Sequence, residues 1–155
     1  MARYHAQCVS PYPAERMFDL VADVESYPAF VPWWVDSKII GQEDGVYQTI
    51  QTMGLGPVRL RFLSRTTMER PNRIHVAAKG GGLKHLELFW GFEELEQGCR
   101  VSLSMDLQMA SPALDLVVSR LSRDAAKTMV DAFCRRAHAV YRENSGLSAP
   151  RVRPA

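Results

Sequence analysis

Side chains alternate between apolar and polar over several short runs from position 35 to position 109, and this period-two pattern constrains the fold more than any other feature. Such alternation is typical of β-strands with one buried and one solvated face. In the clearest run, 101–109, apolar residues stand at every odd position, and between them stand Ser102, Ser104, Asp106 and Gln108. Clusters of glycine, proline and asparagine separate the runs, so we predict six strands joined by tight turns in an antiparallel sheet.

The N-terminal segment carries different signals. Residues 3–9 are short and mixed in character, which predicts a seventh strand at an edge of the sheet. Pro13 suits the first turn of a helix, and apolar residues follow it at helical spacing. A second short helical piece is expected to begin at Ser26 and to end at Pro32.

A single long helix is predicted after the strands. Ser111 and Pro112 form an N-cap followed by proline at the first helical position, and an apolar stripe continues from there. Residues 144–146 (Asn-Ser-Gly) are expected to end the helix, and residues 147–155 to form a disordered tail. This helix is the element large enough to cover the apolar face of the sheet. We therefore predict one α+β domain, residues 1–146, in which a curved antiparallel sheet of about seven strands wraps around the C-terminal helix, with two short helices after the first strand.

The composition excludes several classes of protein. A formal net charge of +2 does not fit a dedicated DNA-binding protein. Cys8, Cys99 and Cys134 are far apart and form no CxxC pair, so we expect free, mostly buried thiols in a reducing compartment. We see no signal-peptide pattern and no apolar run long enough to span a membrane, so we expect a cytoplasmic protein, with peripheral contact at the inner membrane as an option.

Patterns that support catalysis or metal binding are missing from the sequence. No histidine pairs with another histidine or a carboxylate at a metal-ligand spacing such as HExxH, and the sequence has no GxSxG, P-loop or GxGxxG motif. Residues 80–82 (Gly-Gly-Gly) precede a strand rather than a helix, so we expect a hairpin turn there. The inward-facing rows are almost wholly apolar. We therefore expect no catalytic residues, no metal site, no required cofactor and no enzymatic activity.

Two interpretations remain open for one basic strand. Arg59, Arg61 and Arg65 share one face of a strand at period two. They could contact anionic lipid or RNA. They could equally form the ordinary solvated face of an antiparallel sheet.

The adjacent pair Trp33 and Trp34 and the isolated Leu55 are unusual apolar positions. Two neighbouring tryptophans cannot both point inward from an extended segment. One is therefore expected in the core, and the other at the mouth of a cavity or at a membrane interface. Leu55, in a Gly-Leu-Gly-Pro loop, could form a second apolar lip nearby or pack onto the domain.

Three motifs in order resemble one known family. Residues 11–33 (PYPAERMFDLVADVESYPAFVPW) resemble the N-terminal signature of the coenzyme-Q-binding proteins of the START / polyketide cyclase-like superfamily. Residues 82–86 (GLKHL) with 90–92 (WGF), and residues 132–141 (AFCRRAHAVY), are similar to that family's strand and final-helix motifs. The resemblance covers residues 3–143. Trp34 departs from it, since relatives often have a small residue or cysteine there.

The resemblance implies a helix-grip fold with a lipophilic cavity between sheet and helix. It also implies binding of ubiquinone or a related lipid in support of respiratory electron transfer. Some bacterial members of the family are described instead as toxins that bind the large ribosomal subunit and block subunit association.

We therefore expect non-catalytic binding of a hydrophobic ligand, a polyprenyl quinone above all, and no partnership with DNA. The alternatives are a ribosome-binding toxin, which would use the basic strand, and a polyketide cyclase or aromatase. The residue pattern leaves the oligomeric state open. The side chains expected to line the cavity or its mouth are Trp33, Trp34, Leu55, Leu60, Phe62, Leu86, Leu88, Trp90, Leu103, Met105, Met129 and Phe133.

Overall fold

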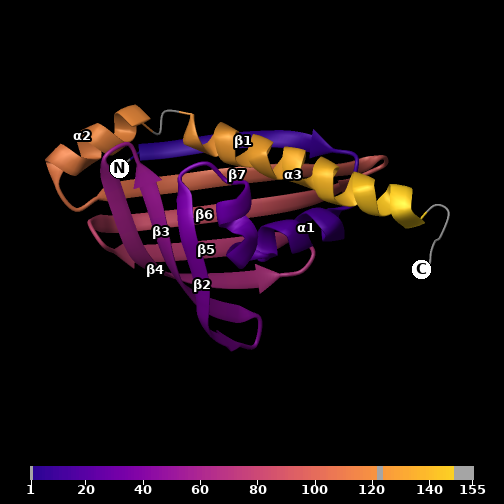
Figure 1. Cartoon of the computed structure of the whole chain (residues 1–155), viewed down its shortest axis with the longest axis horizontal. Coiled ribbons are helices and arrows are strands. Elements are labelled where there is room, and N and C mark those ends of the chain that lie inside the picture. Colours follow the sequence, from indigo (N-terminus) through magenta and orange to yellow (C-terminus); the bar gives the residue numbers. More distant parts are fainter. Residues whose placement is uncertain (1, 122–123, 149–155) are drawn as a thin grey trace.

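One seven-stranded antiparallel sheet forms most of the protein, with strand order β1-β7-β6-β5-β4-β3-β2. The computed structural model describes residues 2–121 and 124–148. The strands are β1 (Ala2–Ser10), β2 (Trp34–Glu43), β3 (Val46–Leu55), β4 (Val58–Glu69), β5 (Arg73–Gly80), β6 (Leu83–Leu95) and β7 (Gly98–Met109). The predicted strand count, the antiparallel pairing and the edge position of β1 are confirmed (Figure 1).

The predicted turn at residues 80–82 is also confirmed. Gly80 ends β5, Gly81 and Gly82 join it to β6, and Gly81 has a φ of +60°. A Cβ atom at Gly81 would lie 1.8 Å from the carbonyl oxygen of Arg61 on β4. Glycine is needed here both for the left-handed backbone and for this close approach.

Two short helices after β1 close one end of the curled sheet. They are α1 (Ala14–Ala22) and the 3-10 helix η1 (Val24–Ala29). The N-terminus of α1 is capped by a residue that is distant in the sequence. The Ala14 amide donates a hydrogen bond of 3.0 Å to the carboxylate of Glu94 on β6. A carboxylate at this position also favours the positive end of the helix dipole.

The long C-terminal helix predicted from the sequence is two helices, α2 (Pro112–Leu121) and α3 (Ala125–Ser148), so the prediction of one element was wrong. Ser111 caps α2 as expected, since its hydroxyl accepts a hydrogen bond of 3.1 Å from the Leu114 amide. The second helix, α3, begins after Asp124, whose carbonyl oxygen accepts a hydrogen bond of 2.8 Å from the Thr128 amide. Apolar residues fall at helical spacing on both sides of the break, so periodicity alone does not reveal it.

The predicted end of the helix at residues 144–146 is also wrong, because α3 continues to Ser148. Glycine ends a helix where it adopts a left-handed conformation; in a helical conformation it only lowers helix propensity, by about 1 kcal/mol. Most of the predicted tail, residues 149–155, lies outside the described part of the chain. Neither α3 nor another helix in the described ranges combines the length and apolar character needed to cross a bilayer.

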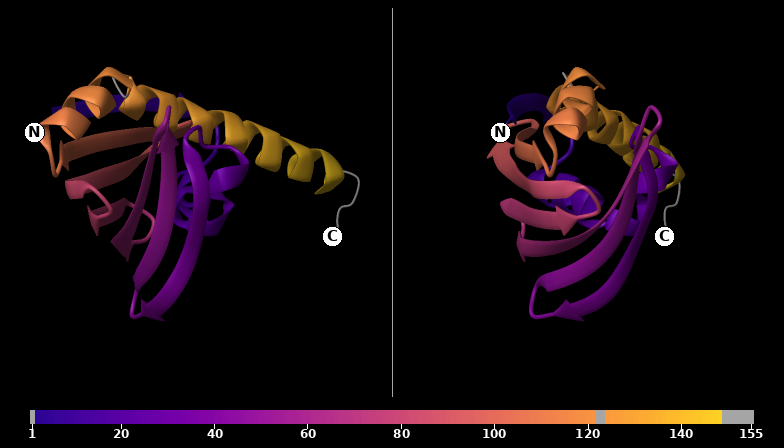
Figure 2. Two further views of the ribbon diagram at one scale, coloured as in Figure 1. Left: turned by 60° about the vertical axis from the view of Figure 1, so that its left-hand side comes forward. Right: turned by 90° about the vertical axis from the view of Figure 1, so that its left-hand side faces the viewer.

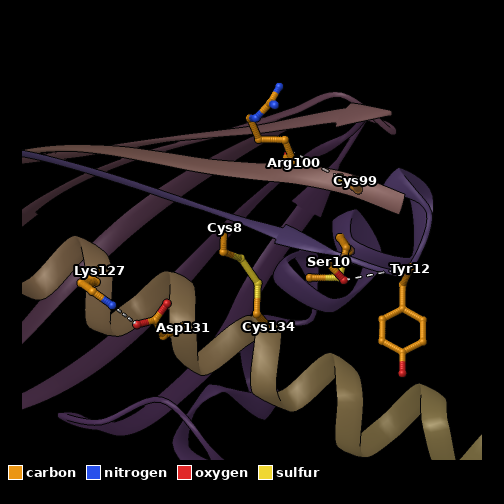
Figure 3. The surroundings of a disulfide bond; sticks show 9 residues. Cys8, Ser10, Tyr12, Cys99, Arg100, Lys127, Asp131 and Cys134 are labelled. Carbon is orange, nitrogen blue, oxygen red and sulfur yellow. Dashed lines mark hydrogen bonds and ion pairs between the residues drawn. A yellow bond between two sulfur atoms is a disulfide. The ribbon is translucent and has the colours of Figure 1, made fainter. Parts of the chain in front are cut away.

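Cys8 of β1 and Cys134 of α3 form a disulfide bond, which contradicts the expectation of free thiols for this pair (Figure 3). The two residues are 126 positions apart, and the packing of α3 along β1 brings them together. No local spacing in the sequence indicates this contact. Cys99 is free and buried, as expected, and burial raises the pKa of its thiol to about 11.

Candidate ligand cavity

A cavity lies between the concave face of the sheet and the helices α2 and α3. Figure 2 shows the sheet curling beneath these two helices. The cavity is small, with a volume of about 30 Å³. Its lining is apolar and comes from many elements between residues 33 and 129: Trp33, Trp34, Met53, Leu60, Phe62, Leu83, Leu86, Leu88, Met105, Leu107, Val118, Ala125 and Met129.

Eight of the twelve residues predicted to contact a ligand line this cavity, and their role in binding stays a prediction. They are Trp33, Trp34, Leu60, Phe62, Leu86, Leu88, Met105 and Met129. The period-two rows of β4, β6 and β7 place the strand residues of this group on the concave face. Leu107 continues the β7 row and could have been included on the same signal, whereas Val118 and Ala125 depend on how α2 and α3 are arranged.

Three of the predicted residues lie elsewhere in the core. The ring of Phe133 packs edge-to-face against the ring of Trp90, with centroids 5.1 Å apart, and against Phe30 at 5.0 Å. Leu103 is fully buried on β7. Phe133 also packs against Tyr27 of η1, and none of the three side chains is among those that line the cavity. The side chain of the twelfth residue, Leu55, is outside the described part of the structure.

A second, smaller hollow adjoins the cavity, and its mostly apolar wall includes a few polar side chains. The two share Trp34, Phe62, Leu86 and Leu88, and the smaller hollow is also bordered by Tyr27, Tyr47, Gln51 and Thr66. The indole Nε1 of Trp34 donates to Gln51 Oε1 over 2.7 Å, and Gln51 Nε2 donates to Ser64 Oγ over 2.7 Å. Buried amides and hydroxyls of this kind are tolerated because they bond to each other.

The expectation of almost wholly apolar inward rows is therefore wrong for the outer half of the sheet. The inward positions of β3 and β4 include Thr49, Gln51, Ser64 and Thr66, all of them buried. On β4 these polar residues follow Leu60 and Phe62 at period two, so the sequence does place them inward. The result is a cavity with an apolar end under α2 and α3 and a polar end near α1.

Two tyrosine hydroxyls bind the C-terminal end of α1 to this polar end. Tyr27 donates to the carbonyl of Val21, and Tyr47 of β3 donates to the carbonyl of Ala22. Burial raises the pKa of Tyr47 to about 12 and the pKa of Tyr27 well above its ordinary value, with a smaller contribution from Asp23 in each case. Both phenols are therefore neutral donors at physiological pH.

Both adjacent tryptophans line the cavity, one of them in the core as expected. Trp33 has a φ of 70°, an uncommon left-handed conformation for a large side chain, so this segment is not extended. Trp34 is the core residue of the pair, at 6% exposed, and Trp33 is half-buried. The Gly54 amide donates a 2.7 Å hydrogen bond to the Trp33 carbonyl, which confirms that the tryptophan pair and the β3–β4 turn are neighbours.

The basic strand lies on the opposite, convex face. Arg59, Arg61 and Arg65 of β4 are exposed, and they alternate with the buried Leu60 and Phe62. The predicted shared face is confirmed. These arginines do not contribute to the cavity, so a charged partner and an apolar ligand would occupy different sides of the sheet.

Comparison with known proteins agrees with this architecture. The family described as "Polyketide cyclase / dehydrase and lipid transport" matches residues 10–134. The ribosome association toxin RatA of Pseudomonas aeruginosa is 34% identical over 132 residues, which cover 84% of this chain and 92% of that protein. The mitochondrial coenzyme Q-binding protein COQ10 homolog B of Xenopus laevis is 29% identical over 143 residues, 89% of this chain and 59% of that protein.

Among solved structures, a Streptomyces aromatase/cyclase superposes with a TM-score of 0.80, covering 97% of this chain and 99% of that one at 13% identity. At this level of identity the likeness shows the fold alone. It confirms the predicted curled sheet with helices across its open face. Together, the matched family and the toxin relative show that this chain belongs to the polyketide cyclase / dehydrase and lipid transport family.

Proposed function

We propose that the protein binds a long apolar small molecule without transforming it, and that a polyprenyl quinone such as ubiquinone is its ligand. The observation that carries this proposal is the apolar cavity between the sheet and helices α2 and α3. Burying an isoprenoid chain there removes apolar surface from water, which is worth about 0.8 kcal/mol for each buried CH2 group. A relative named for coenzyme Q binding and a family described by lipid transport support the choice of ligand.

The polar hollow suits the other end of such a ligand. A quinone ring carries carbonyl acceptors, and Gln51 and Thr66 border the hollow with amide and hydroxyl groups. The two hollows share Trp34 and Phe62 as walls, so a single molecule could occupy both. In this arrangement the tail would lie under α2 and α3 and the ring near α1.

A carrier of this kind needs no acid–base chemistry. None of the thirteen side chains that line the apolar cavity is charged. The tyrosines near the polar hollow donate to backbone carbonyls and have raised pKa values. We therefore place the protein among carriers rather than cyclases, in the cytoplasm, with transient contact at the inner membrane, where it would support respiratory electron transport.

Ligand entry requires the cavity to widen, because its free space is now too small for a quinone ring. The boundary between α2 and α3 lies close to it, since Val118 of α2 and Ala125 of α3 both belong to the lining. Displacement of the short helix α2 from the sheet would open the apolar end of the cavity, and α3 could remain folded. Closure of such an element over a bound ligand is a common way to exclude water.

Quinone titration with tryptophan fluorescence tests this proposal. Trp33 and Trp34 line the cavity, so a bound quinone should quench their emission in proportion to occupancy. Ala125→Leu places extra carbon in the cavity and should weaken binding at least tenfold, whereas Ala139→Leu, on an exposed site of the same helix, should leave it unchanged. Equal affinities for the parent protein and a folded Ala125→Leu variant would place the ligand elsewhere.

A second function, association with the large ribosomal subunit, has its own supporting observation. The relative with 34% identity is named a ribosome association toxin, and Arg59, Arg61 and Arg65 form an exposed basic row on the convex face. Phosphate contacts by such a row make affinity fall steeply with salt. We propose this row as the contact surface for that function.

Replacing these three arginines with serine tests the second function. The triple variant should bind large subunits more weakly and show a flatter salt dependence in sedimentation assays. Serine at the exposed helical positions Arg120 and Arg135 serves as a control that also lowers the net charge. If both variants lose the same affinity, net charge rather than this row accounts for the binding.

A further inference from the structure

Three side chains that could bind a metal, and a histidine that contacts one of them, meet on the convex face of the sheet, away from the cavity. They come from three neighbouring strands: His75 of β5, His85 and Glu87 of β6, and Asp106 of β7. One ligand atom each from His85, Glu87 and Asp106 lies within 4.8 Å of the others. His85 Nε2 is 3.1 Å from Glu87 Oε1, and His75 Nε2 is 2.8 Å from the other carboxylate oxygen, Oε2.

The strand register places two carboxylates directly opposite each other. Glu87 pairs with Asp106 between β6 and β7, and like charges at such a position destabilise a sheet unless a cation lies between them. The Arg3 guanidinium is 3.4 Å from Asp106, but its side chain is 78% exposed, so solvent screens much of this attraction. Glu87 and Asp106 are only 28% and 24% exposed.

The donor set and its spacing suit a transition-metal ion. Zinc binds imidazole nitrogen and carboxylate oxygen at roughly 2.0–2.2 Å, so ligand atoms around one ion lie within about 4.4 Å of each other. Small side-chain rotations would bring the observed three atoms to that spacing. Two carboxylates and an imidazole leave a fourth position for water, and the imidazole favours zinc-like ions over magnesium or calcium.

His75 completes the arrangement from outside the ligand set. Its bond to Glu87 Oε2 leaves Oε1 directed at His85, and its ring stacks on Phe89 with centroids 4.7 Å apart. Partners of this kind fix the orientation of a ligating carboxylate, and their loss typically lowers metal affinity 10–100-fold. His75 is thus a positioning residue for Glu87.

We propose that His85, Glu87 and Asp106 bind one divalent first-row transition ion of the zinc class on the convex face. The site is separate from the lipid cavity and does not depend on the proposed quinone function. It departs from the expectation, drawn from the sequence, that this chain has no metal site. His85 and Glu87 share a strand face at period two, but Asp106 joins them only through the β6–β7 register.

Calorimetric titration of the tag-free protein with Zn²⁺ tests the site. A Cys99→Ser background removes the one free thiol of the chain, and the parental chain serves as a parallel sample. We expect one equivalent of Zn²⁺ to bind and to raise the melting temperature. His85→Ala and Asp106→Asn should abolish both effects, and His75→Ala should weaken binding 10–100-fold.

His5→Ala is the matched control. His5 lies on the same sheet and contacts Ser104 at 2.9 Å, and its removal should leave Zn²⁺ affinity unchanged. The Co²⁺ complex should show the absorption of a nitrogen- and oxygen-ligated ion without thiolate bands. Binding that survives His85→Ala, or that falls equally in His5→Ala, would overturn the proposal, as would the absence of stoichiometric binding.

Discussion

Trp34 and Gln51 are joined by a hydrogen bond of 2.7 Å between the indole nitrogen and the amide oxygen, deep inside the sheet's concave face. The amide nitrogen of Gln51 in turn donates a hydrogen bond to the hydroxyl of Ser64. The bond holds the start of β2 against β3 at the point where the apolar cavity meets its polar neighbour. Trp34 is therefore held in the core, whereas Trp33, which is half-buried, is the more exposed of the two in the cavity wall.

Removal of this amide should destabilise the protein. Gln51→Leu leaves the Trp34 N–H and the Ser64 hydroxyl buried without their partner, which typically costs about 1–3 kcal/mol for each such group. Gln48→Leu, at an exposed position on the same strand, should change the free energy of unfolding by less than about 0.5 kcal/mol. Urea unfolding of both variants measures the difference. Equal stabilities would mean that the buried chain of bonds contributes little.

Alkaline pH should destabilise the protein through its buried tyrosines. The pKa of Tyr47 is about 12 in the folded protein and about 10 when unfolded, so its stabilising contribution is complete below pH 10 and lost as the pH rises toward 12. Tyr47→Phe should lose about 0.5–1.5 kcal/mol at pH 8, because the hydrogen bond to Ala22 is gone. Its stability should then fall less steeply than the parent's between pH 10 and 12. Identical slopes in chemical denaturation would contradict the account.

Trp33 should control the rate of ligand exchange. It is half-buried, lines the cavity and is bound by its carbonyl to Gly54 in the neighbouring turn. Trp33→Ala should speed both uptake and release of a short-chain quinone by several-fold in stopped-flow fluorescence, since the aromatic ring no longer closes the mouth. Trp33→Phe should remain near the parental rates. Unchanged kinetics in Trp33→Ala would locate the entrance elsewhere, for example at α2.

Thiol counting should report one free cysteine in the unreduced chain. Alkylation under denaturing conditions should modify Cys99 alone before reduction and all three cysteines after it, because Cys8 and Cys134 are bonded. In the native state Cys99 should react slowly, since burial raises its thiol pKa to about 11. Three alkylated cysteines without prior reduction would show that the Cys8–Cys134 bond is absent in solution.

The fold could be predicted from the sequence because period-two rows and turn residues are local signals. The same period-two alternation that predicts the strand β6 also predicts that Leu86 and Leu88 point inward, toward the cavity. The break between α2 and α3 could not be predicted, because the apolar spacing continues across it. The Cys8–Cys134 contact and the Glu87–Asp106 pairing both depend on which distant elements lie side by side.

The site was only partly predictable for a related reason. A period-two pattern tells which face a side chain occupies, but not which part of that face remains unfilled. Leu103 and Phe133 are on the correct side, yet the rings of Phe30, Tyr27 and Trp90 occupy the space around Phe133. Two neighbouring tryptophans cannot both point inward from an extended segment, whereas Trp33 has a left-handed backbone and lines the cavity beside Trp34.

Native mass spectrometry of the protein purified from its own host, followed by organic extraction, tests the central claim most directly. We predict one polyprenyl quinone per chain in the parental protein and in Ala139→Leu, and strongly reduced occupancy in a folded Ala125→Leu variant purified in parallel. A folded parental protein that carries no lipid, and that takes up no ubiquinone from vesicles, would contradict the claim that this cavity binds a hydrophobic ligand.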